Sequence, residues 1–139
     1  MEEQRIKIEQ LRWMYAGLAG ICLAFFLALF GSGISLSKSP WIIGATICFS
    51  ISLPLFTAFT IAHIILIESN FTPTMYEPVL KSIRIKIITY IAVISFYIGF
   101  LLMISYISLL ISALILLVSI YSYIELRRFF NNVYKQNTL

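Results

Sequence analysis

The stretch that decides the fold is IITYIAVISFYIGFLLMISYISLLISALILLVSIYSYI, residues 87–124, a run of 38 residues without a charged side chain. As a single helix with ~1.5 Å rise per residue it would be about 57 Å long, almost twice the ~30 Å hydrocarbon core of a bilayer. We therefore expect the run to fold back on itself, with its turn at residues 104–106. No glycine or proline marks this turn.

Two further apolar stretches precede this run. The chain has 139 residues, of which 60% are hydrophobic and 12% charged, so it has too few polar side chains to cover a soluble domain of this size. Its mean hydropathy is +0.96. The sequence predicts one all-α membrane domain, residues 1–139, with four transmembrane helices at residues 14–31, 41–67, 83–103 and 106–124.

The basic residues predict the orientation of these helices. Nine of the ten fall on one side of a four-span chain: Arg5, Lys7, Arg12, Lys81, Arg84, Lys86, Arg127, Arg128 and Lys135. The positive-inside rule then places both termini in the cytoplasm, in the inner membrane of a cell. The expected cytoplasmic parts are an amphipathic N-terminus (1–12), a loop (68–82) and a basic tail (125–139). A cleaved signal peptide is the less favoured interpretation of the first span, whose apolar region is longer than the usual ~7–15 residues.

Few side chains are suited to catalysis. There is no Asp, and the chain has one His and two Cys. No metal-binding, phosphate-binding or nucleophile motif is present. The basic residues are dispersed, without a nucleic-acid-binding signature. We therefore expect no enzyme activity, no cofactor, no metal and no direct contact with nucleic acid.

Two spans carry stripes that are typical of helix packing. Small residues recur at every fourth position of the first span, and serines lie within a ~60° arc of the fourth. One stripe could close the bundle while the other binds a second copy, which predicts a symmetric homo-oligomer. The residues of these two predicted seams are Ala16, Gly20, Ala24 and Ala28, and Ser105, Ser108, Ser112 and Ser119.

The second span has a stripe of hydroxyl groups beside Pro54, which should kink its helix and free a backbone carbonyl. Together with the only His in the chain, these groups form a candidate polar path: Thr46, Ser50, Thr57, Thr60 and His63. With Glu68 nearby, His63 could also sense pH or relay a proton. Ordinary packing is the favoured interpretation of the hydroxyls, because no charged residue accompanies them.

Two segments outside the bilayer combine aromatic or Met side chains with positive charge, which suits a protein-binding patch. The alternative is that these side chains lie among lipid headgroups, where aromatic residues are common. The candidate contacts with a cytosolic protein partner are Phe71, Met75 and Tyr76 in the loop and Arg127, Arg128, Phe129 and Phe130 in the tail.

The function that these features favour is that of a non-enzymatic inner-membrane subunit, which oligomerises and anchors or signals to a cytosolic partner. A small homo-oligomeric pore and a membrane-embedded toxin-immunity protein are the alternatives. The chain has 25 Ile against nine Ala, a bias typical of AT-rich genes. Because such genes often lie on acquired islands, a role in phage defence is a further expectation.

Overall fold

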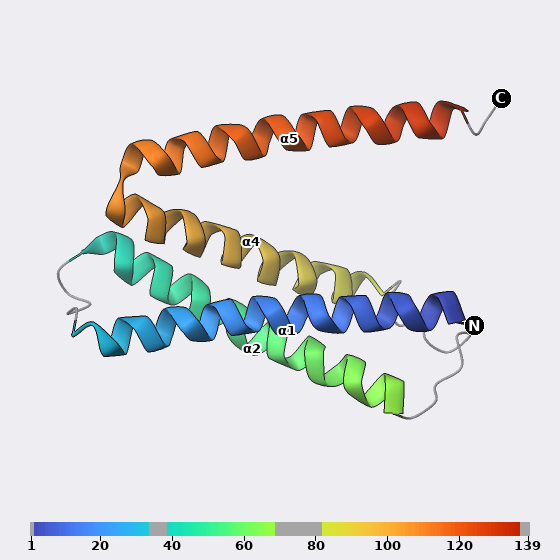
Figure 1. The fold of residues 1–139 in the computed structure, drawn as a ribbon, viewed down its shortest axis with the longest axis horizontal. Coiled ribbons are helices and arrows are strands. Elements are labelled where there is room, and N and C mark those ends of the chain that lie inside the picture. Colours follow the sequence, from blue (N-terminus) through green and yellow to red (C-terminus); the bar gives the residue numbers. More distant parts are fainter. Residues whose placement is uncertain (1, 34–38, 69–81, 137–139) are drawn as a thin grey trace.

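The computed structural model describes residues 2–33, 39–68 and 82–136, and every regular element in these ranges is an α-helix. The helices are α1 (Glu2–Gly31), α2 (Pro40–Glu68), α4 (Ile83–Ile107) and α5 (Leu109–Gln136), as labelled in Figure 1. Each contains a stretch long and apolar enough to cross a membrane: Ile8–Gly31, Pro40–Glu68, Ile83–Ile107 and Leu109–Phe129. The predicted all-α fold with four spans is confirmed, and the chain is a multi-pass membrane protein.

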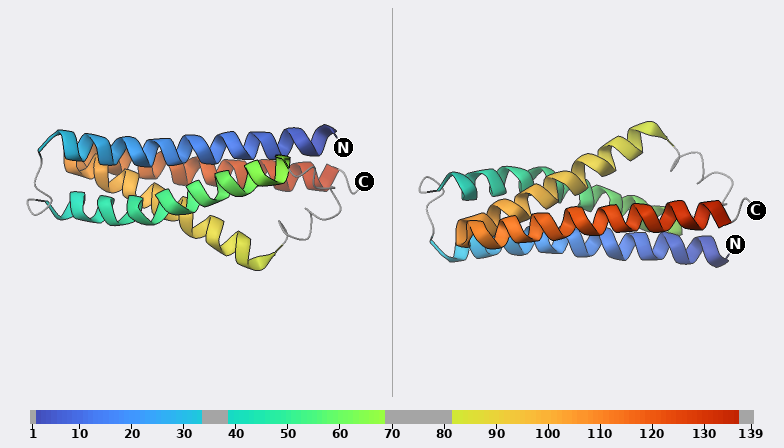
Figure 2. Two further views of the ribbon diagram at one scale, coloured as in Figure 1. Left: turned by 90° about the horizontal axis from the view of Figure 1, so that it is seen from below. Right: turned by 90° about the horizontal axis from the view of Figure 1, so that it is seen from above.

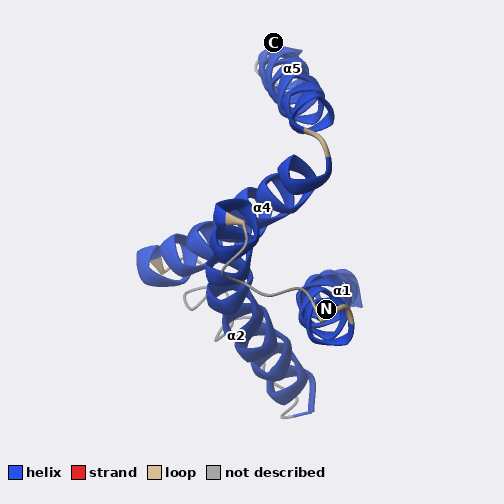
Figure 3. Cartoon of the chain, turned by 90° about the vertical axis from the view of Figure 1, so that its left-hand side faces the viewer, coloured by secondary structure: helices blue, strands red, loops and turns tan. Residues whose placement is uncertain are grey.

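The four helices run up and down, so that both termini lie at the same end of the bundle (Figure 1). We call this the terminal end, and the opposite end, where α4 meets α5, the turn end. Helix α2 packs against both α1 and α4. Helix α5 packs against α4 and stands apart from α1 and α2 (Figure 3). The bundle is therefore a core of three helices with a fourth helix attached at one side.

The fold-back within residues 87–124 occurs, but its turn is Ser108 and not residues 104–106 as the sequence suggested. Ser108 is extended (φ −158°, ψ 117°), and its N–H donates to the carbonyl of Ile104, which ends α4. Its hydroxyl accepts the N–H of Ile111 at 3.4 Å, as an N-cap does for the helix that follows. One serine thus caps both helices, which explains how the chain reverses without Gly or Pro.

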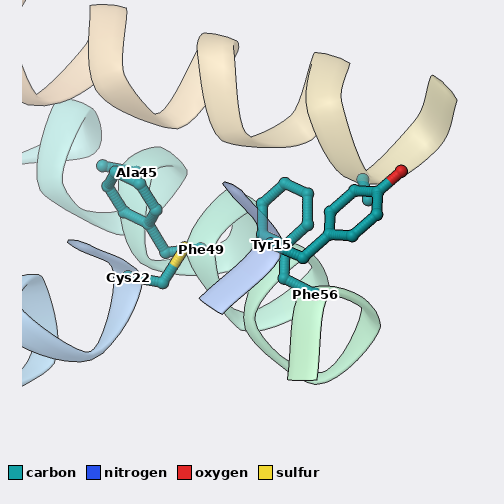
Figure 4. Close-up of a cluster of buried hydrophobic side chains, with 6 residues drawn as sticks. Tyr15, Cys22, Ala45, Phe49 and Phe56 are labelled. Atoms are coloured by element: carbon teal, nitrogen blue, oxygen red, sulfur yellow. The ribbon is translucent and has the colours of Figure 1, made fainter. Parts of the chain in front are cut away.

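Helix α1 faces α2 with a heptad pattern. Tyr15, Cys22 and Leu29 follow one another at seven-residue intervals, and all three are buried. Spacing of this kind keeps one seam of a helix facing a neighbour that crosses at a small angle. Figure 4 shows Tyr15 beside Phe56 and Cys22 beside Phe49. The partly buried side chains packed around this core on α1 are Leu11, Leu18, Ala19, Phe25 and Phe26.

Helices α2 and α4 approach closely because glycines lie at their contact. A Cβ built on Gly99 would be 3.0 Å from Cys48 Cβ and 3.5 Å from the carbonyl oxygen of Ala45. A Cβ on Gly44 would be 2.9 Å from Leu102 Cδ1. Small residues permit such approaches between membrane helices, which then gain dispersion energy along their length. Beyond the contact, α2 changes direction (Figure 2), and Pro54 lies inside this helix.

The first prediction concerns this contact. Gly99→Val should force α2 and α4 apart and lower the free energy of unfolding by about 1–3 kcal/mol, as overpacked cores do. Thermal unfolding in mild detergent measures the change. The matched control is Gly17→Val in α1, where nothing lies within 4 Å of an added Cβ, so that the stability should change little. Equal losses for the two variants would contradict the assigned contact.

Candidate functional site

Hydroxyl groups join α2 and α4 across their contact. Ser52 is fully buried, and its single hydroxyl proton is shared between the carbonyl oxygen of Ala92 on α4, 3.1 Å from Oγ, and that of Cys48, 3.0 Å from Oγ. From the other side, Ser95 Oγ donates to the same Cys48 carbonyl at 2.9 Å. Because hydrocarbon offers polar groups no partner, such bonds between helices hold them in one register.

These inter-helix serines were not singled out by the sequence analysis. The signal that could have found them is a pair of matching small-residue stripes with spacings of three and four residues, which place side chains on one helix face. The stripes are Ala45, Cys48 and Ser52 on α2 and Ala92, Ser95 and Gly99 on α4. They were less visible than the every-fourth-residue ridge on α1, because their members are spaced alternately three and four residues apart and differ in type.

An aromatic cluster at the terminal half of the bundle surrounds His63. The ring of Tyr15 on α1 lies 5.5 Å from that of His63, 5.2 Å from Phe59 and 6.1 Å from Phe56. His63 is only 5% exposed, and its Nδ1 lies 2.6 Å from the carbonyl oxygen of Phe59. Since a carbonyl can only accept, this nitrogen carries a proton. The His63 ring is thus part of the contact between α1 and α2.

The predicted polar path does not converge on His63. The hydroxyls of Thr46, Thr57 and Thr60 each donate to a carbonyl four residues earlier on α2 itself, at 2.7 to 2.9 Å. Ser50 and Thr57 are exposed on the outside of the bundle, whereas His63 faces Tyr15. Hydroxyls that bond their own helix in this way need no water to satisfy them.

The small-residue ridge of the first span lies on the outside. Ala16 is partly buried, whereas Gly20, Ala24 and Ala28 are exposed, on the side of α1 away from Tyr15 and Cys22. Nothing lies within 4 Å of a Cβ added to Gly20. The ridge therefore takes little part in packing within the chain, and its role in an oligomer stays a prediction.

The serine stripe of the last predicted span lies at the turn between α4 and α5. Ser105 Oγ donates to the Leu101 carbonyl at 2.8 Å and contacts Ser112 Oγ at 2.9 Å. Ser112 Oγ also reaches the Leu101 carbonyl at 3.2 Å. Ser108 forms the turn itself, and Ser119, about three helical turns further along, is partly buried. Within the chain, this stripe fastens the first turns of α5 to α4.

The predicted partner contacts are only partly visible. Phe71, Met75 and Tyr76 lie outside the described residues, and the side chain of Phe130 does too. The other three predicted tail residues are exposed in the terminal half of α5: Arg127, Arg128 and Phe129. Arg128 pairs with Glu125 at 2.9 Å, one helical turn earlier.

In the described ranges, no three His, Cys, Asp or Glu side chains lie close enough together to hold a metal ion. Cys22 and Cys48 are both free thiols, and Cys22 is buried between α1 and α2. A thiol in such a place packs as a small apolar side chain.

The second prediction tests the bonds between α2 and α4. Ser52→Ala should lower the free energy of unfolding by about 0.6–1.7 kcal/mol, which runs from the average to the largest value measured for hydrogen bonds between membrane helices. Ser50→Ala, on the exposed side of the same helix, is the matched control and should be close to neutral. Unfolding in mixed detergent measures both. A Ser52→Ala chain as stable as the parent would show that its bonds contribute nothing.

The third prediction concerns the aromatic cluster. Tyr15→Ala should cost about 3–5 kcal/mol of stability, because it removes a buried ring that contacts three others. Tyr121→Ala, on the exposed part of α5, should change the stability little. Thermal unfolding of the two variants in the same detergent makes the comparison. A larger loss for Tyr121→Ala would contradict the packing described.

The described residues thus form a tightly joined three-helix core, an aromatic cluster around His63 and an α5 helix that is fastened only near its turn. No protein-family model matches the chain, and comparisons with curated proteins and with solved structures found no match either. What the protein does is therefore inferred from its own helices and side chains.

Proposed function

We propose that this protein is a non-enzymatic membrane subunit, which assembles with copies of itself and anchors a cytosolic protein at its terminal end. The observation that carries the proposal is the position of α5. This helix leaves the three-helix core, so that most of its described surface is available to another protein, and it carries the exposed basic side chains of Arg127 and Arg128 in its terminal half. An arm of this kind serves attachment better than catalysis.

The lengths of α1 and α5 support a contact outside the bilayer. Helix α5 has 28 residues, and α1 has 30, so they are about 42 and 45 Å long, against a hydrocarbon core of ~30 Å. The apolar span of α5 ends at Phe129, whereas its helix continues to Gln136. Both helices therefore extend beyond the membrane, and they do so at the same end of the bundle (Figure 1).

The charges at this end support its placement in the cytoplasm. Arg12, Arg84, Lys86, Arg127 and Arg128 all belong to helix segments at the terminal end. Such an accumulation is typical of the cytoplasmic side of a membrane protein. The exposed Arg127 and Arg128 would contact an acidic surface of the partner, since guanidinium groups bind carboxylates in paired hydrogen bonds.

The fourth prediction tests the anchoring. With the double variant Arg127→Ala/Arg128→Ala, the amount of cytosolic protein that co-purifies should fall by a factor of about ten or more. Each charge-assisted hydrogen bond that is lost weakens the binding free energy by more than about 1.4 kcal/mol, which corresponds to a tenfold change in affinity. The matched control, Arg84→Ala/Lys86→Ala, removes the same charge from the same end of the bundle. Quantitative mass spectrometry of proteins that co-purify from cross-linked membranes is the measurement.

Self-assembly is tested with two copies that carry different tags. We expect one tag to recover the other from mild detergent. The proposal would be contradicted if purification through one tag recovered no copy with the other tag, and if both double variants also co-purified with equal amounts of cytosolic protein. Conductance in planar bilayers would favour the pore, and protection of cells from a toxin would favour the immunity protein.

A further inference from the structure

A tyrosine hydroxyl near the middle of α4 is buried without a hydrogen-bond partner. It belongs to Tyr97, and none of the described residues forms a hydrogen bond with its Oη atom. Buried hydroxyls are almost always paired, because an unpaired one has given up its bonds to water and gained none in return. The hydrocarbon of a bilayer offers no acceptor either. The described packing therefore leaves the hydroxyl of Tyr97 with a proton that it does not donate.

Tyr97 lies on the side of α4 that faces α5. It precedes Leu101 by four residues, a spacing that places two side chains on one helix face. The Leu101 carbonyl accepts the hydroxyl of Ser112 on α5 at 3.2 Å. Four residues after Leu101, Ser105 Oγ contacts Ser112 Oγ at 2.9 Å. Tyr97, Leu101 and Ser105 thus form one row along α4, and α5 is fastened to the end of this row that lies nearest the turn.

The α5 hydroxyl at the level of Tyr97 is that of Ser119. Helices α4 and α5 are antiparallel (Figure 1), so a residue some positions before Ser105 lies opposite one the same number of positions after Ser112. Tyr97 is eight positions before Ser105, and Ser119 is seven positions after Ser112. Seven residues are two helical turns, so Ser119 shares the face of Ser112, and it is partly buried. Its hydroxyl oxygen can accept the proton of a phenol.

We propose that α5 has a second, closed position on α4, in which the hydroxyl of Tyr97 donates to the hydroxyl oxygen of Ser119. In the described position the two helices separate toward the terminal end (Figure 1). The hinge is Ser108, the single extended residue that joins them. Turning α5 about this residue prolongs the contact from Ser112 along the rest of α4. The inference does not depend on the cytosolic partner or on the self-assembly proposed above.

Closure would bury a pair of side chains that the described position leaves exposed. Tyr90 lies seven residues before Tyr97, and Leu126 lies seven residues after Ser119, so the same register brings them opposite each other. In the described position Tyr90 is 68% exposed and Leu126 is 54% exposed. Arg128 is two residues from Leu126, about 200° around the helix, and so stays on the outer side. The closed arm thus hides one face of α5 and leaves this cation accessible.

Disulfide cross-linking in intact membranes tests the closed position. The double variant Tyr90→Cys/Leu126→Cys should form an internal disulfide on mild oxidation, in several-fold excess over the control, because closure brings the two thiols together. The matched control is Tyr90→Cys/Ile124→Cys, since Ile124 is about 200° around the helix from Leu126, on the side away from α4. The parent chain, which contains Cys22 and Cys48, gives the background.

The role of the hydroxyl pair is tested in the same double-cysteine chain. Tyr97→Phe removes only the phenol oxygen and should slow disulfide formation about threefold, as the loss of an average hydrogen bond between membrane helices does. Ser119→Ala should slow it equally, and the two changes together should slow it no further, because they remove the same bond. Tyr121→Phe removes a hydroxyl from an exposed side of α5 and should leave the rate unchanged.

Three results would overturn the inference. The first is equal cross-linking of the Leu126 and Ile124 pairs, which would mean that α5 does not close on α4. The second is a disulfide between two chains in place of an internal one. The third is an unchanged rate with Tyr97→Phe or with Ser119→Ala, which would show that this bond does not hold the arm. Equal recovery of every variant in the membrane fraction checks that the chain still folds.

Discussion

The fold depends on the close approach of α2 and α4. Inside a bilayer, packing apolar side chains against each other yields little hydrophobic free energy. The lipid chains that they would otherwise contact are just as apolar. Helices must then be held by dense packing and by hydrogen bonds. Gly99 and Gly44 allow the approach, and Ser52 and Ser95 exploit it by reaching carbonyl groups across the contact. This pair of helices is the part of the molecule that is best defined by specific contacts.

The other helices are placed relative to this pair. Helix α1 packs against α2 through a heptad seam and an aromatic cluster that includes His63, so a residue that sequence analysis marked for chemistry contributes to packing. Helix α5 is fastened to α4 by a few serine hydroxyls near Ser108. Dense contacts on one side of α4 and sparse contacts on the other explain why three helices form a core and the fourth is an arm.

Satisfied hydroxyl groups also bear on function. The threonines of α2 donate to their own helix, and Ser95, Ser105 and Ser112 of α4 and α5 bond to carbonyl oxygens or to one another. These hydroxyl groups are thus accounted for by helix geometry and helix association. The exposed surface of α5, with Arg127 and Arg128 near its terminal end, is available for interaction with other proteins, and it is the reason we favour a subunit of an assembly.

The sequence by itself determined the number and the type of the membrane helices, and that residues 87–124 fold back. The reason is that bilayer thickness and the need to satisfy every backbone group leave few alternatives for a chain this apolar. The sequence did not determine the turn residue. Ser108, which caps two helices, is one of several serines near the fold-back, and nothing in the residue type distinguishes it from the others. Nor did it determine which faces meet: three apolar-rich spans each offered a plausible stripe, and the stripe that joins α2 to α4 was not among them. Only the tertiary structure decided this, because in lipid a helix face is selected by its fit to one particular neighbour and not by its hydrophobicity.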